Sequence, residues 1–376
     1  MPARKTRSEK VKGEPAPRGT PADAPKALYA EIVAKLGAWF DAERRDLSWR
    51  RTRDPYAIWL SEVMLQQTRV KTVEDYFPRF LKAYPTVSHL AKADISGVLA
   101  AWSGLGYYRR ARALHAGARE VVEQYGGKIP GDAASLRSIS GIGPYTAGAI
   151  SSIAFGAQEA LVDGNVARVL ARIFALQCDV RSPAGLKQVW ELAKALVPAD
   201  RPGRHNESLM ELGATICLPS TPRCEACPVR TLCEGRRLGI EKELPIAKKK
   251  KAPREVNMLA LVSRRGKSVL LGRRLPGGLF GGLWEPPMIE CGDSNAESSL
   301  AKSIGAALDD VKHVAEQTHI LTHRRLRITI ATARIKSEPS PASGTPYECL
   351  AWKGASELGS LAMSSLAKKV LLACPG

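Results

Sequence analysis

Long apolar runs are absent from this sequence, and their absence argues against a membrane-spanning helix. Although 44% of the 376 residues are apolar, no run approaches the roughly 20 consecutive apolar residues that cross a bilayer. Residues 1–27 also lack the apolar centre of a secretory signal and are rich in Lys, Arg, Pro and Ala. We interpret them as a disordered basic arm, although a transit peptide has a similar composition. The sequence predicts a soluble protein.

Acidic residues are fewer than basic residues. Asp and Glu number 37 against 56 Lys and Arg, which gives a formal net charge of +19. A surface of that charge attracts a polyanion before any specific contact forms, so nucleic acid is the first candidate partner. The length allows two or three domains. We expect an intracellular protein, cytoplasmic and nucleoid-associated in a bacterium and otherwise nuclear or mitochondrial.

Cysteines are too few for a disulfide scaffold. The chain has eight, and four of them, Cys217, Cys224, Cys227 and Cys233, have six, two and five residues between them. Four thiolates in one loop can enclose a metal centre in a reducing compartment. Structural zinc is the alternative, but zinc sites usually contain two Cys-x-x-Cys pairs and this loop contains one, so spacing alone gives an iron-sulfur cluster a small advantage. The other cysteines are expected to be buried as small apolar residues: Cys178, Cys291, Cys349 and Cys374.

The part of the chain that follows the basic arm has a helical pattern. Apolar residues recur three or four positions apart from residue 27 to about residue 237, which predicts one all-α domain at 28–238. The clearest helical segments are residues 28–39, 58–70 and 186–196. No internal repeat stands out.

The remaining residues have a different pattern. Residues 239–255 include four consecutive lysines and are predicted to be an extended linker. The segment 256–376 mixes short apolar or alternating runs with helical periodicity, which predicts an α/β module. The expected strands are 258–262, 268–271 and 326–335, and the expected helices are 296–308 and 361–372.

Residues 136–150 have the pattern of two helices joined by a tight turn. Gly141 and Gly143 are placed to allow that turn at the start of the second helix. Backbone N–H groups at such a helix start point toward an anion and can hold a DNA phosphate without reading the base sequence. A plain connection between helices is the alternative. The segment that follows at 162–166, Val-Asp-Gly-Asn-Val, strengthens the DNA-binding interpretation.

Two acidic residues are candidates for chemistry at a glycosidic bond. An Asp-Gly-Asn sequence at Asp163 is ordinarily a turn or a helix N-cap. A carboxylate fixed there could also stabilise the positive charge that develops on a sugar as its bond to a base breaks. Glu62 lies in a predicted helix with apolar neighbours one turn away, which would raise its pKa and make it a proton donor. A solvated helix glutamate is the alternative.

Several segments of the helical part occur together: Trp49-Arg50, 59–68, 104–112, 162–166 and the cysteine loop. Together they resemble the MutY family of adenine DNA glycosylases, within the endonuclease-III-like, helix-hairpin-helix superfamily, from about residue 28 to residue 237. The resemblance implies a 4Fe-4S cluster on the four clustered cysteines. It also implies removal of adenine mispaired with 8-oxoguanine, with Glu62 protonating the adenine at N7 and Asp163 stabilising the oxocarbenium-like sugar.

The same resemblance implies further roles. Gln67 and Tyr107 would be inserted into the base stack, and the remaining pocket, DNA-contacting or water-ordering residues would be Trp49, Arg50, Leu65, Asn165 and Glu207. Trp49 as a core residue and Tyr107 as a packed aromatic are the alternatives. Endonuclease III carries a Schiff-base lysine where this chain has Tyr145, and without that amine a covalent lyase step lacks its nucleophile. The resemblance therefore favours a monofunctional glycosylase.

The C-terminal module carries a second resemblance. Residues 280–287, Phe-Gly-Gly-Leu-Trp-Glu-Pro-Pro, resemble a strand and loop of the MutT-like (Nudix) domain that follows the glycosylase domain in the MutY family. The metal-binding signature of the hydrolases is missing from about 282–304, which predicts recognition of an oxidised base rather than pyrophosphate hydrolysis. The family's Phe-Ser-His tip corresponds here to Leu321-Thr322-His323, where the aromatic residue is lost.

We therefore predict a monofunctional, monomeric adenine DNA glycosylase of base excision repair. It would hydrolyse the N-glycosidic bond of adenine opposite 8-oxoguanine or guanine in duplex DNA. A non-catalytic DNA-damage sensor on the same scaffold is the alternative, but such a binder needs neither Glu62 nor Asp163. Nucleotide hydrolysis by the module is disfavoured because the metal-binding residues are missing.

Overall fold

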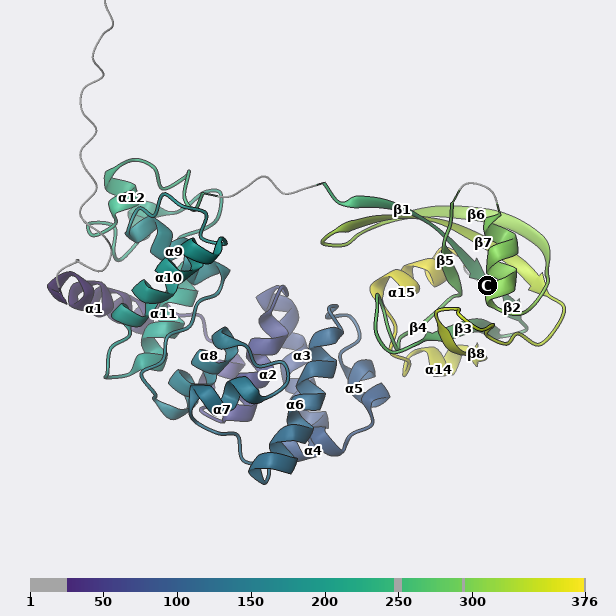
Figure 1. Cartoon of the computed structure of the whole chain (residues 1–376), viewed down its shortest axis with the longest axis horizontal. Helices are drawn as coiled ribbons and strands as arrows, with labels where there is room; N and C mark the ends of the chain where they lie inside the picture. The colour runs from purple at the N-terminus through teal and green to yellow at the C-terminus, as the bar shows by residue number, and fades with distance from the viewer. Residues whose placement is uncertain (1–25, 247–251, 293–294, 375–376) are drawn as a thin grey trace, which may run out of the picture. The chain divides into compact units, whose positions relative to one another are not determined.

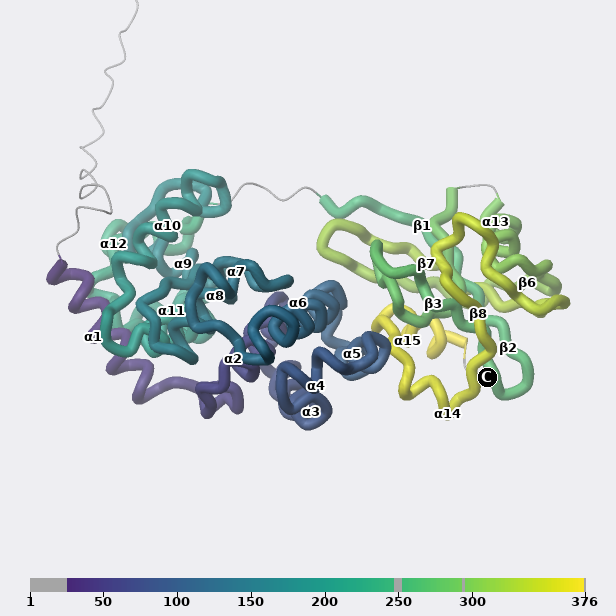
Figure 2. The backbone as a smooth tube through the Cα atoms, turned by 60° about the horizontal axis from the view of Figure 1, so that its bottom comes forward, coloured from purple at the N-terminus to yellow at the C-terminus, as the bar shows by residue number. Residues whose placement is uncertain are grey.

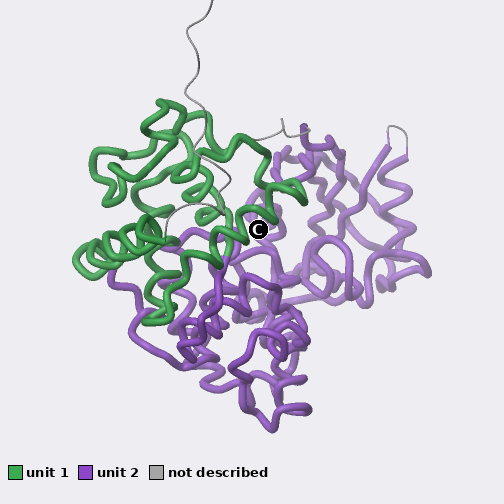
Figure 3. The backbone as a smooth tube through the Cα atoms, turned by 60° about the vertical axis from the view of Figure 1, so that its left-hand side comes forward, with its two compact units in different colours: residues 1–44, 162–247 green, residues 45–161, 248–376 purple. Residues whose placement is uncertain are grey.

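The computed structural model describes residues 26–246, 252–292 and 295–374. The predicted disordered arm therefore lies outside the described residues except for its last two positions, which begin a helix. Two compact units make up the chain (Figure 3). Unit 1 comprises Met1–Arg44 and Val162–Ala247, and unit 2 comprises Arg45–Leu161 and Lys248–Gly376.

Unit 1 is helical. Its helices are α1 (Lys26–Glu43), α9 (Gly164–Ile173), α10 (Pro183–Leu196), α11 (Pro202–Thr215), the short 3-10 turn η3 (Cys224–Ala226) and α12 (Glu234–Arg237). Helix α9 packs against α10, α11 and α12, and all its residues from Val166 onward are buried. A Cβ atom added at Gly213 would lie 2.6 Å from the Cβ atom of Asn165, so glycine permits the close approach of α11 to α9.

The first part of unit 2 is also helical (Figure 1). It contains η2 (Ser48–Arg51), α2 (Pro55–Leu65), α3 (Val70–Ala83), α4 (Val87–Lys92), α5 (Ile95–Ala101), α6 (Arg109–Tyr125), α7 (Ala133–Ser138) and α8 (Pro144–Phe155). Helix α2 packs against α3, α6 and α8 and is buried from Tyr56 to Met64. Asp54 caps its start by accepting from the Tyr56 backbone N–H at 3.0 Å, and Pro55 occupies the first turn.

The second part of unit 2 is an α/β module. Its elements are β1 (Arg254–Val262), β2 (Arg264–Arg265), β3 (Ser268–Arg274), β4 (Trp284–Glu285), β5 (Met288–Glu290), α13 (Ala296–Ser303), β6 (Leu308–Ile320), β7 (Arg324–Ile335), β8 (Tyr347–Gly354), α14 (Ala355–Leu358) and α15 (Ser365–Leu372). One sheet has the strand order β5-β1-β7-β6, with β1 and β7 parallel, and the other joins β2, β3, β4 and β8.

Successive side chains of β1 pack into two different hydrophobic cores of the module. Met258 and Ala260 pack with Leu366 of α15, whereas Leu259 and Leu261 pack with residues of α13. Because successive side chains of a strand point to opposite faces, α13 and α15 cover opposite faces of the sheet (Figure 2). The predicted fold class, an all-α part followed by an α/β module, is confirmed.

The predicted helix 58–70 was wrong in its extent. The structure contains two helices there, because α2 ends at Leu65 and α3 begins at Val70. Gln67, between them, has a left-handed backbone with φ 55°. A residue in that conformation cannot continue a right-handed helix, so the chain turns at this point.

The predicted helix 296–308 was also too long. It ends at Ser303, and Leu308 already begins β6. Gly305 has φ 61°, and a Cβ atom there would lie 2.3 Å from the carbonyl oxygen of Ser340. The close approach and the positive φ both require glycine and stop the helix.

Two further boundaries differ from their predictions. The predicted helix 361–372 begins only at Ser365, capped by the preceding serine side chain. The predicted linker 239–255 starts within unit 1, where Leu244 is buried, and Arg254 is already the first residue of β1. No described helix is long and apolar enough to cross a membrane.

Candidate active site and cysteine pocket

Asp163 forms the N-cap of α9. Its Oδ1 atom accepts from the Val166 backbone N–H at 2.7 Å, and its Oδ2 atom accepts from Asn165 Nδ2 at 3.0 Å. The expected N-cap geometry is therefore present. Burial raises the pKa of Asp163 above its ordinary value, and the hydrogen bonds from Val166 and Asn165 oppose that shift. The result is a carboxylate of fixed orientation, weakly solvated, whose charge gains strongly from a nearby cation.

Arg168 connects the Asp163 turn to the cysteine loop. Its Nη2 atom donates to Asn165 Oδ1 at 2.9 Å, and its Nε atom donates to the Cys217 carbonyl oxygen at 2.8 Å. Asn165 in turn holds Asp163. Arg168 is 9% exposed, so this series of hydrogen bonds is largely shielded from water. It holds Asn165, and through Asn165 it orients the Asp163 carboxylate.

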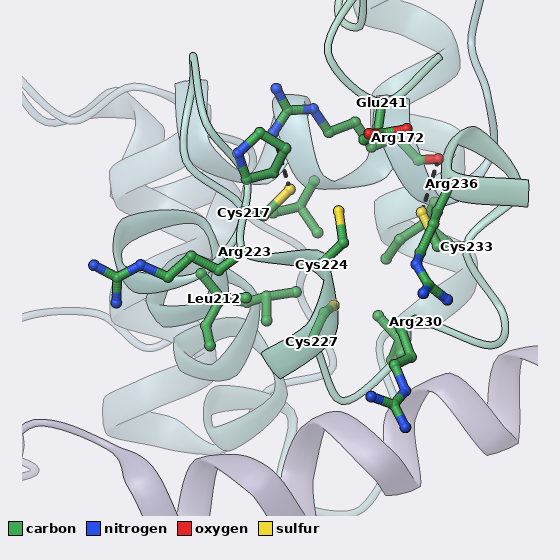
Figure 4. A pocket seen from close by; sticks show the side chains of 15 residues that line it. Arg172, Leu212, Cys217, Arg223, Cys224, Cys227, Arg230, Cys233, Arg236 and Glu241 are labelled. Carbon is green, nitrogen blue, oxygen red and sulfur yellow. Dashed lines mark hydrogen bonds between the residues drawn. The ribbon is translucent and has the colours of Figure 1, made fainter. Parts of the chain in front are cut away.

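The four clustered cysteines line one pocket in unit 1. Figure 4 shows Cys217, Cys224, Cys227 and Cys233 around it, with side chains of α9 and α11 forming part of the wall. Burial, with smaller contributions from the neighbouring cysteines, raises the pKa of Cys227 to about 12 and that of Cys233 to about 11. Buried thiols with such high pKa values become thiolates only beside strong positive charge, which a bound metal centre supplies.

Buried Arg172 fixes this loop from α9. Its Nη1 atom lies 3.3 Å from Cys217 Sγ and donates to the Leu218 carbonyl oxygen at 2.6 Å, and Nη2 donates to the Pro219 carbonyl oxygen at 2.8 Å. The Cys233 thiol lies 3.3 Å from the Arg172 carbonyl oxygen. One residue of α9 therefore contacts the first and last cysteines of the set.

The other cysteines correct one prediction. Of the four expected to be buried, only Cys374 is; Cys178, Cys291 and Cys349 are half-buried. Cys178 and Cys291 lie in loops, and Cys349 lies within β8. The prediction rested on the general preference of free cysteine for the interior, which is a tendency and not a rule.

Arginines of the cysteine loop are partly neutralised. Arg236 pairs with Glu225 at 2.7 Å, and Arg230 lies 3.7 Å from the same carboxylate. Arg237 pairs with Glu234 at 2.5 Å. These exposed pairs leave less unpaired positive charge for a phosphate than the number of arginines in the loop suggests, and Glu225 and Glu234 would compete with DNA for them.

Glu62 lies on α2 and is 5% exposed, so it is not a solvated helix glutamate. Tyr145, in the first turn of α8, donates a hydrogen bond from its hydroxyl to Glu62 Oε2. The two residues are 83 positions apart in the sequence, and the packing of α2 against α8 brings them together. This hydrogen bond holds the Glu62 carboxyl group in a defined orientation.

The turn between α7 and α8 has the expected hairpin form, with one difference. Gly141 has φ 81°, and a Cβ atom there would lie 2.8 Å from Ala113 Cβ, so glycine is required. Gly143 has φ −88° and ψ 179°, an extended conformation open to any residue, and a Cβ atom there would meet no atom of the chain within 4 Å. Only Gly141 is needed for the turn itself.

Gln67 and Tyr107 share an unusual backbone. Both have positive φ values, 55° and 48°, although neither is glycine. Both side chains are exposed, with Tyr107 48% exposed, so the packed-aromatic alternative for Tyr107 is wrong. Left-handed conformations of non-glycine residues are strained and concentrate at functional sites.

The remaining predicted residues of the helical part are placed as follows. Trp49 is 7% exposed and makes an edge-to-face contact with Phe77 at 5.7 Å, so it is a core residue whatever else it does. Arg50 donates to the Arg45 carbonyl oxygen at 3.2 Å. Leu65 is half-buried at the end of α2, and Glu207 on α11 is 5% exposed.

The predicted lesion-contacting tip is the turn between β6 and β7. Leu321 packs against the module core, while Thr322 and His323 are exposed. The Leu321 N–H donates to the Arg324 carbonyl oxygen at 2.8 Å, which closes the hairpin. The Thr322 hydroxyl lies 2.9 Å from the Tyr107 hydroxyl within unit 2.

Comparison with known proteins places this geometry in a family. Residues 60–195 match the "HhH-GPD superfamily base excision DNA repair protein" family, and residues 258–373 match "NUDIX domain". The "Adenine DNA glycosylase" of Homo sapiens is 35% identical over 91% of this chain and 74% of its own length, and that of Rattus norvegicus is 35% identical over 92% and 80%. The chain belongs to the adenine DNA glycosylase family.

Solved structures agree with the fold of this adenine DNA glycosylase's helical part. A thermostable thymine-DNA glycosylase is 32% identical, with a TM-score of 0.53 over 57% of this chain and 99% of that protein. An endonuclease III bound non-covalently to DNA is 21% identical, with a TM-score of 0.50 over 58% of this chain and 99% of that protein, and shows the shared fold alone.

Sequence reasoning missed three arginines of this adenine DNA glycosylase that hold the backbone next to predicted site residues. Arg110, Arg168 and Arg172 donate mainly to backbone carbonyl oxygens, which no side-chain pattern reveals. One signal was available for two of them. Arg168 and Arg172 are four residues apart in an otherwise apolar helix, so both lie on one face of a helix that is buried. Buried arginines at that spacing predict organised acceptors nearby.

Proposed function

We propose that this adenine DNA glycosylase excises adenine opposite 8-oxoguanine or guanine in duplex DNA, by hydrolysis of the N-glycosidic bond. The relatives named above extend over the C-terminal module as well as the helical part, which supports the proposal. The observations that carry it are two carboxyl groups, each held by a specific donor: the buried Glu62 in unit 2, and the half-buried Asp163 in unit 1, whose pKa burial raises.

The chemistry follows from those two groups. Glu62 donates a proton to N7 of the adenine, the C1′–N9 bond breaks, and its electron pair leaves with the base. Positive charge develops on the sugar, and the Asp163 carboxylate stabilises it because its weak solvation leaves its field unscreened. Water then adds to C1′ and its proton passes to the Glu62 carboxylate, which restores the acid. Tyr145 holds the Glu62 carboxyl group in one orientation throughout.

We propose hydrolysis without a covalent enzyme–DNA intermediate. Tyr145 occupies the hairpin position where a Schiff-base enzyme of this superfamily carries a lysine, and its hydroxyl is committed to Glu62. A phenol cannot form an imine with the sugar aldehyde. The product would therefore be an intact abasic site rather than a nicked strand.

Duplex binding is proposed to use the hairpin and the two exposed turns. The open space around Gly143, at the start of α8, allows a phosphate to approach the backbone N–H groups there. Gln67 and Tyr107 would enter the base stack and offset part of the few kcal/mol needed to unstack the target nucleotide. The net charge of +19 supplies the long-range attraction.

The cysteine pocket is proposed to hold a 4Fe-4S cluster. Its four thiols face one pocket, yet no three Cys, His, Asp or Glu side chains within the described residues are grouped so that they could hold a metal ion. Four cysteine thiolates are the donor set that a 4Fe-4S cluster takes, which supports the proposal. When bound, the cluster would cross-link the loop and fix the Cys217 backbone that Arg168 contacts. Purified protein should contain iron and acid-labile sulfide in equal amounts, and zinc in their place would overturn this assignment.

The module is proposed to recognise the oxidised base. Thr322 and His323 are exposed at the β6–β7 turn: His323 offers an imidazole to a base edge, and Thr322 offers a hydroxyl once it leaves the Tyr107 hydroxyl that it contacts here. The aromatic residue of the family's tip is replaced by Leu321, which packs into the module core. Recognition therefore depends on the two polar side chains. His323→Ala should slow adenine release opposite 8-oxoguanine more than it slows adenine release opposite guanine.

A substrate panel tests the proposed function. Single-turnover base release would be measured on duplexes with adenine opposite 8-oxoguanine, guanine or thymine, and on a duplex with an oxidised pyrimidine. We expect release opposite 8-oxoguanine and guanine only, strand breaks only after alkali, and no borohydride-trapped protein–DNA adduct. Release of the oxidised pyrimidine with a trapped adduct would instead indicate endonuclease-III-like activity.

A further inference from the structure

Two of the turns in the helical part that contain a left-handed, non-glycine residue, those at Gln67 and Tyr107, are contacted by the same arginine side chain. Gln67 follows α2 and Tyr107 precedes α6, and each holds a left-handed backbone conformation that costs roughly 1–3 kcal/mol for a residue with a side chain. Such conformations persist only where their surroundings determine them. Something in the fold must therefore hold both turns, and the half-buried Arg110, in the first turn of α6, is placed to do it.

Arg110 reaches six acceptors with its two terminal nitrogens. Nη1 donates to three carbonyl oxygens on the Gln67 side, those of Val63 at 2.8 Å, Met64 at 2.9 Å and Gln66. Nη2 donates to Thr68 Oγ1 at 3.0 Å on the same side. On the Tyr107 side, Nη2 contacts the carbonyl oxygens of Leu105 at 3.3 Å and Gly106 at 3.2 Å. The guanidinium is therefore shared between the residues that flank Gln67 and those that precede Tyr107.

The physical setting favours a cation at this place. The carbonyl groups of Val63 and Met64 belong to the last turn of α2, where they have no partner within the helix and carry the negative end of its dipole. Burial lowers the pKa of Arg110 to about 10, which still leaves it charged at neutral pH. The guanidinium also lies 5.5 Å from the Trp102 ring and 5.4 Å from the Tyr107 ring, within cation–π range.

We propose that Arg110 is a positioning residue that locks the Gln67 and Tyr107 turns to each other, so that both side chains enter the DNA as one rigid pair. This inference rests on the proposed function, in which these two residues are inserted into the base stack. Lysine cannot replace arginine here, because one ammonium offers three donors from a single point and cannot span acceptors on both turns. Loss of the lock would leave each turn free to relax toward ordinary φ values.

The test compares Arg110→Lys with Arg119→Lys, a matched change on the same helix at an exposed residue that pairs with Glu123. Single-turnover release would be measured on a fully paired adenine–8-oxoguanine duplex and on one whose flanking mismatches already unstack the adenine. We expect Arg110→Lys to slow the paired substrate about 10- to 100-fold and the unstacked one less than about 3-fold, because only the first needs accurate insertion. Arg119→Lys should leave both rates unchanged.

A fluorescence readout separates insertion from chemistry. 2-Aminopurine placed beside the target base brightens when the stack opens, so native protein should raise its fluorescence and Arg110→Lys should lose most of that rise at saturating protein. Thr68→Val removes one acceptor without touching the arginine and should give a smaller loss of the same kind. This second variant keeps the test valid if Arg110→Lys folds poorly.

The outcomes distinguish the two proposals. Equal slowing on both duplexes, or an unchanged fluorescence rise in Arg110→Lys, would overturn the positioning role. If native protein released no adenine while its fluorescence rise still depended on Arg110, the positioning role would stand and the proposed function would fail.

Discussion

His205 makes the stability of unit 1 depend on pH. It lies on α11, is 3% exposed, and neither ring nitrogen has a hydrogen-bond partner among the described residues. Burial lowers its pKa from 6.5 to about 4. The unfolded chain therefore takes up a proton as the pH falls through 6.5, whereas the folded chain does not until about pH 4. The contribution of neutral His205 to the free energy of unfolding is therefore fully present above pH 6.5 and is lost as the pH falls from 6.5 to 4.

The size of the effect follows from that interval. At about 1.4 kcal/mol per pKa unit, the folded state loses about 2 kcal/mol relative to the unfolded state by pH 5 and about 3 kcal/mol near pH 4. The substitution His205→Phe keeps an aromatic ring of similar size and removes the titration. The variant should therefore be less sensitive to acid than the native protein by those amounts, whatever its stability at pH 7.5.

Urea unfolding followed by circular dichroism at pH 7.5 and pH 5 measures this difference, and amide hydrogen exchange of Pro202–Thr215, corrected for intrinsic rates, locates it on α11. A substitution at the exposed His89, His89→Gln, serves as the control and should leave the pH dependence as it is in the native protein. If the native protein and His205→Phe lost the same stability between the two pH values, the buried, neutral state of His205 would be refuted.

Three further predictions concern the site. Tyr145→Phe should slow adenine release about tenfold without changing duplex affinity, because Glu62 loses its hydroxyl donor; an unchanged rate in rapid-quench assays would contradict this. Arg172→Gln should speed the loss of iron to a chelator, since the Cys217 loop loses its contacts to α9, and unaltered iron retention would contradict that role. Duplex affinity should fall by about tenfold or more between 50 and 200 mM salt, as titrations at each concentration would show, and a flat dependence would exclude phosphate contacts as the main source of binding.

The sequence predicted most of what side-chain chemistry determines. Motif segments identified Glu62, Asp163 and the four clustered cysteines, and the structure holds Glu62 and Asp163 with specific donors and gathers the cysteines around one pocket. Glu62 could not be judged buried from the sequence, because its burial comes from α8, some 80 residues away. The roles of these residues in catalysis stay proposals until they are measured.

What the sequence could not predict depends on backbone groups and tertiary context. Strand β6 was missed because it is a sheet edge, where both faces are largely exposed and polar residues interrupt the alternation. The break after Leu65 was missed because Gln66, with ψ 114°, and the left-handed Gln67 end the helix without a Gly or Pro to signal it. Arg110 was missed because five of its six acceptors are carbonyl oxygens, which every residue has.

The most direct test of the account is single-turnover adenine release from a duplex containing adenine opposite 8-oxoguanine, comparing the native protein with Asp163→Asn. Asparagine keeps the size of the side chain and an acceptor for the Val166 N–H, but it removes the negative charge. We predict rapid release by the native protein and a loss of at least about 100-fold in the variant, with duplex binding retained. Equal rates for the two proteins, or no release by native protein that carries its cluster, would contradict the account.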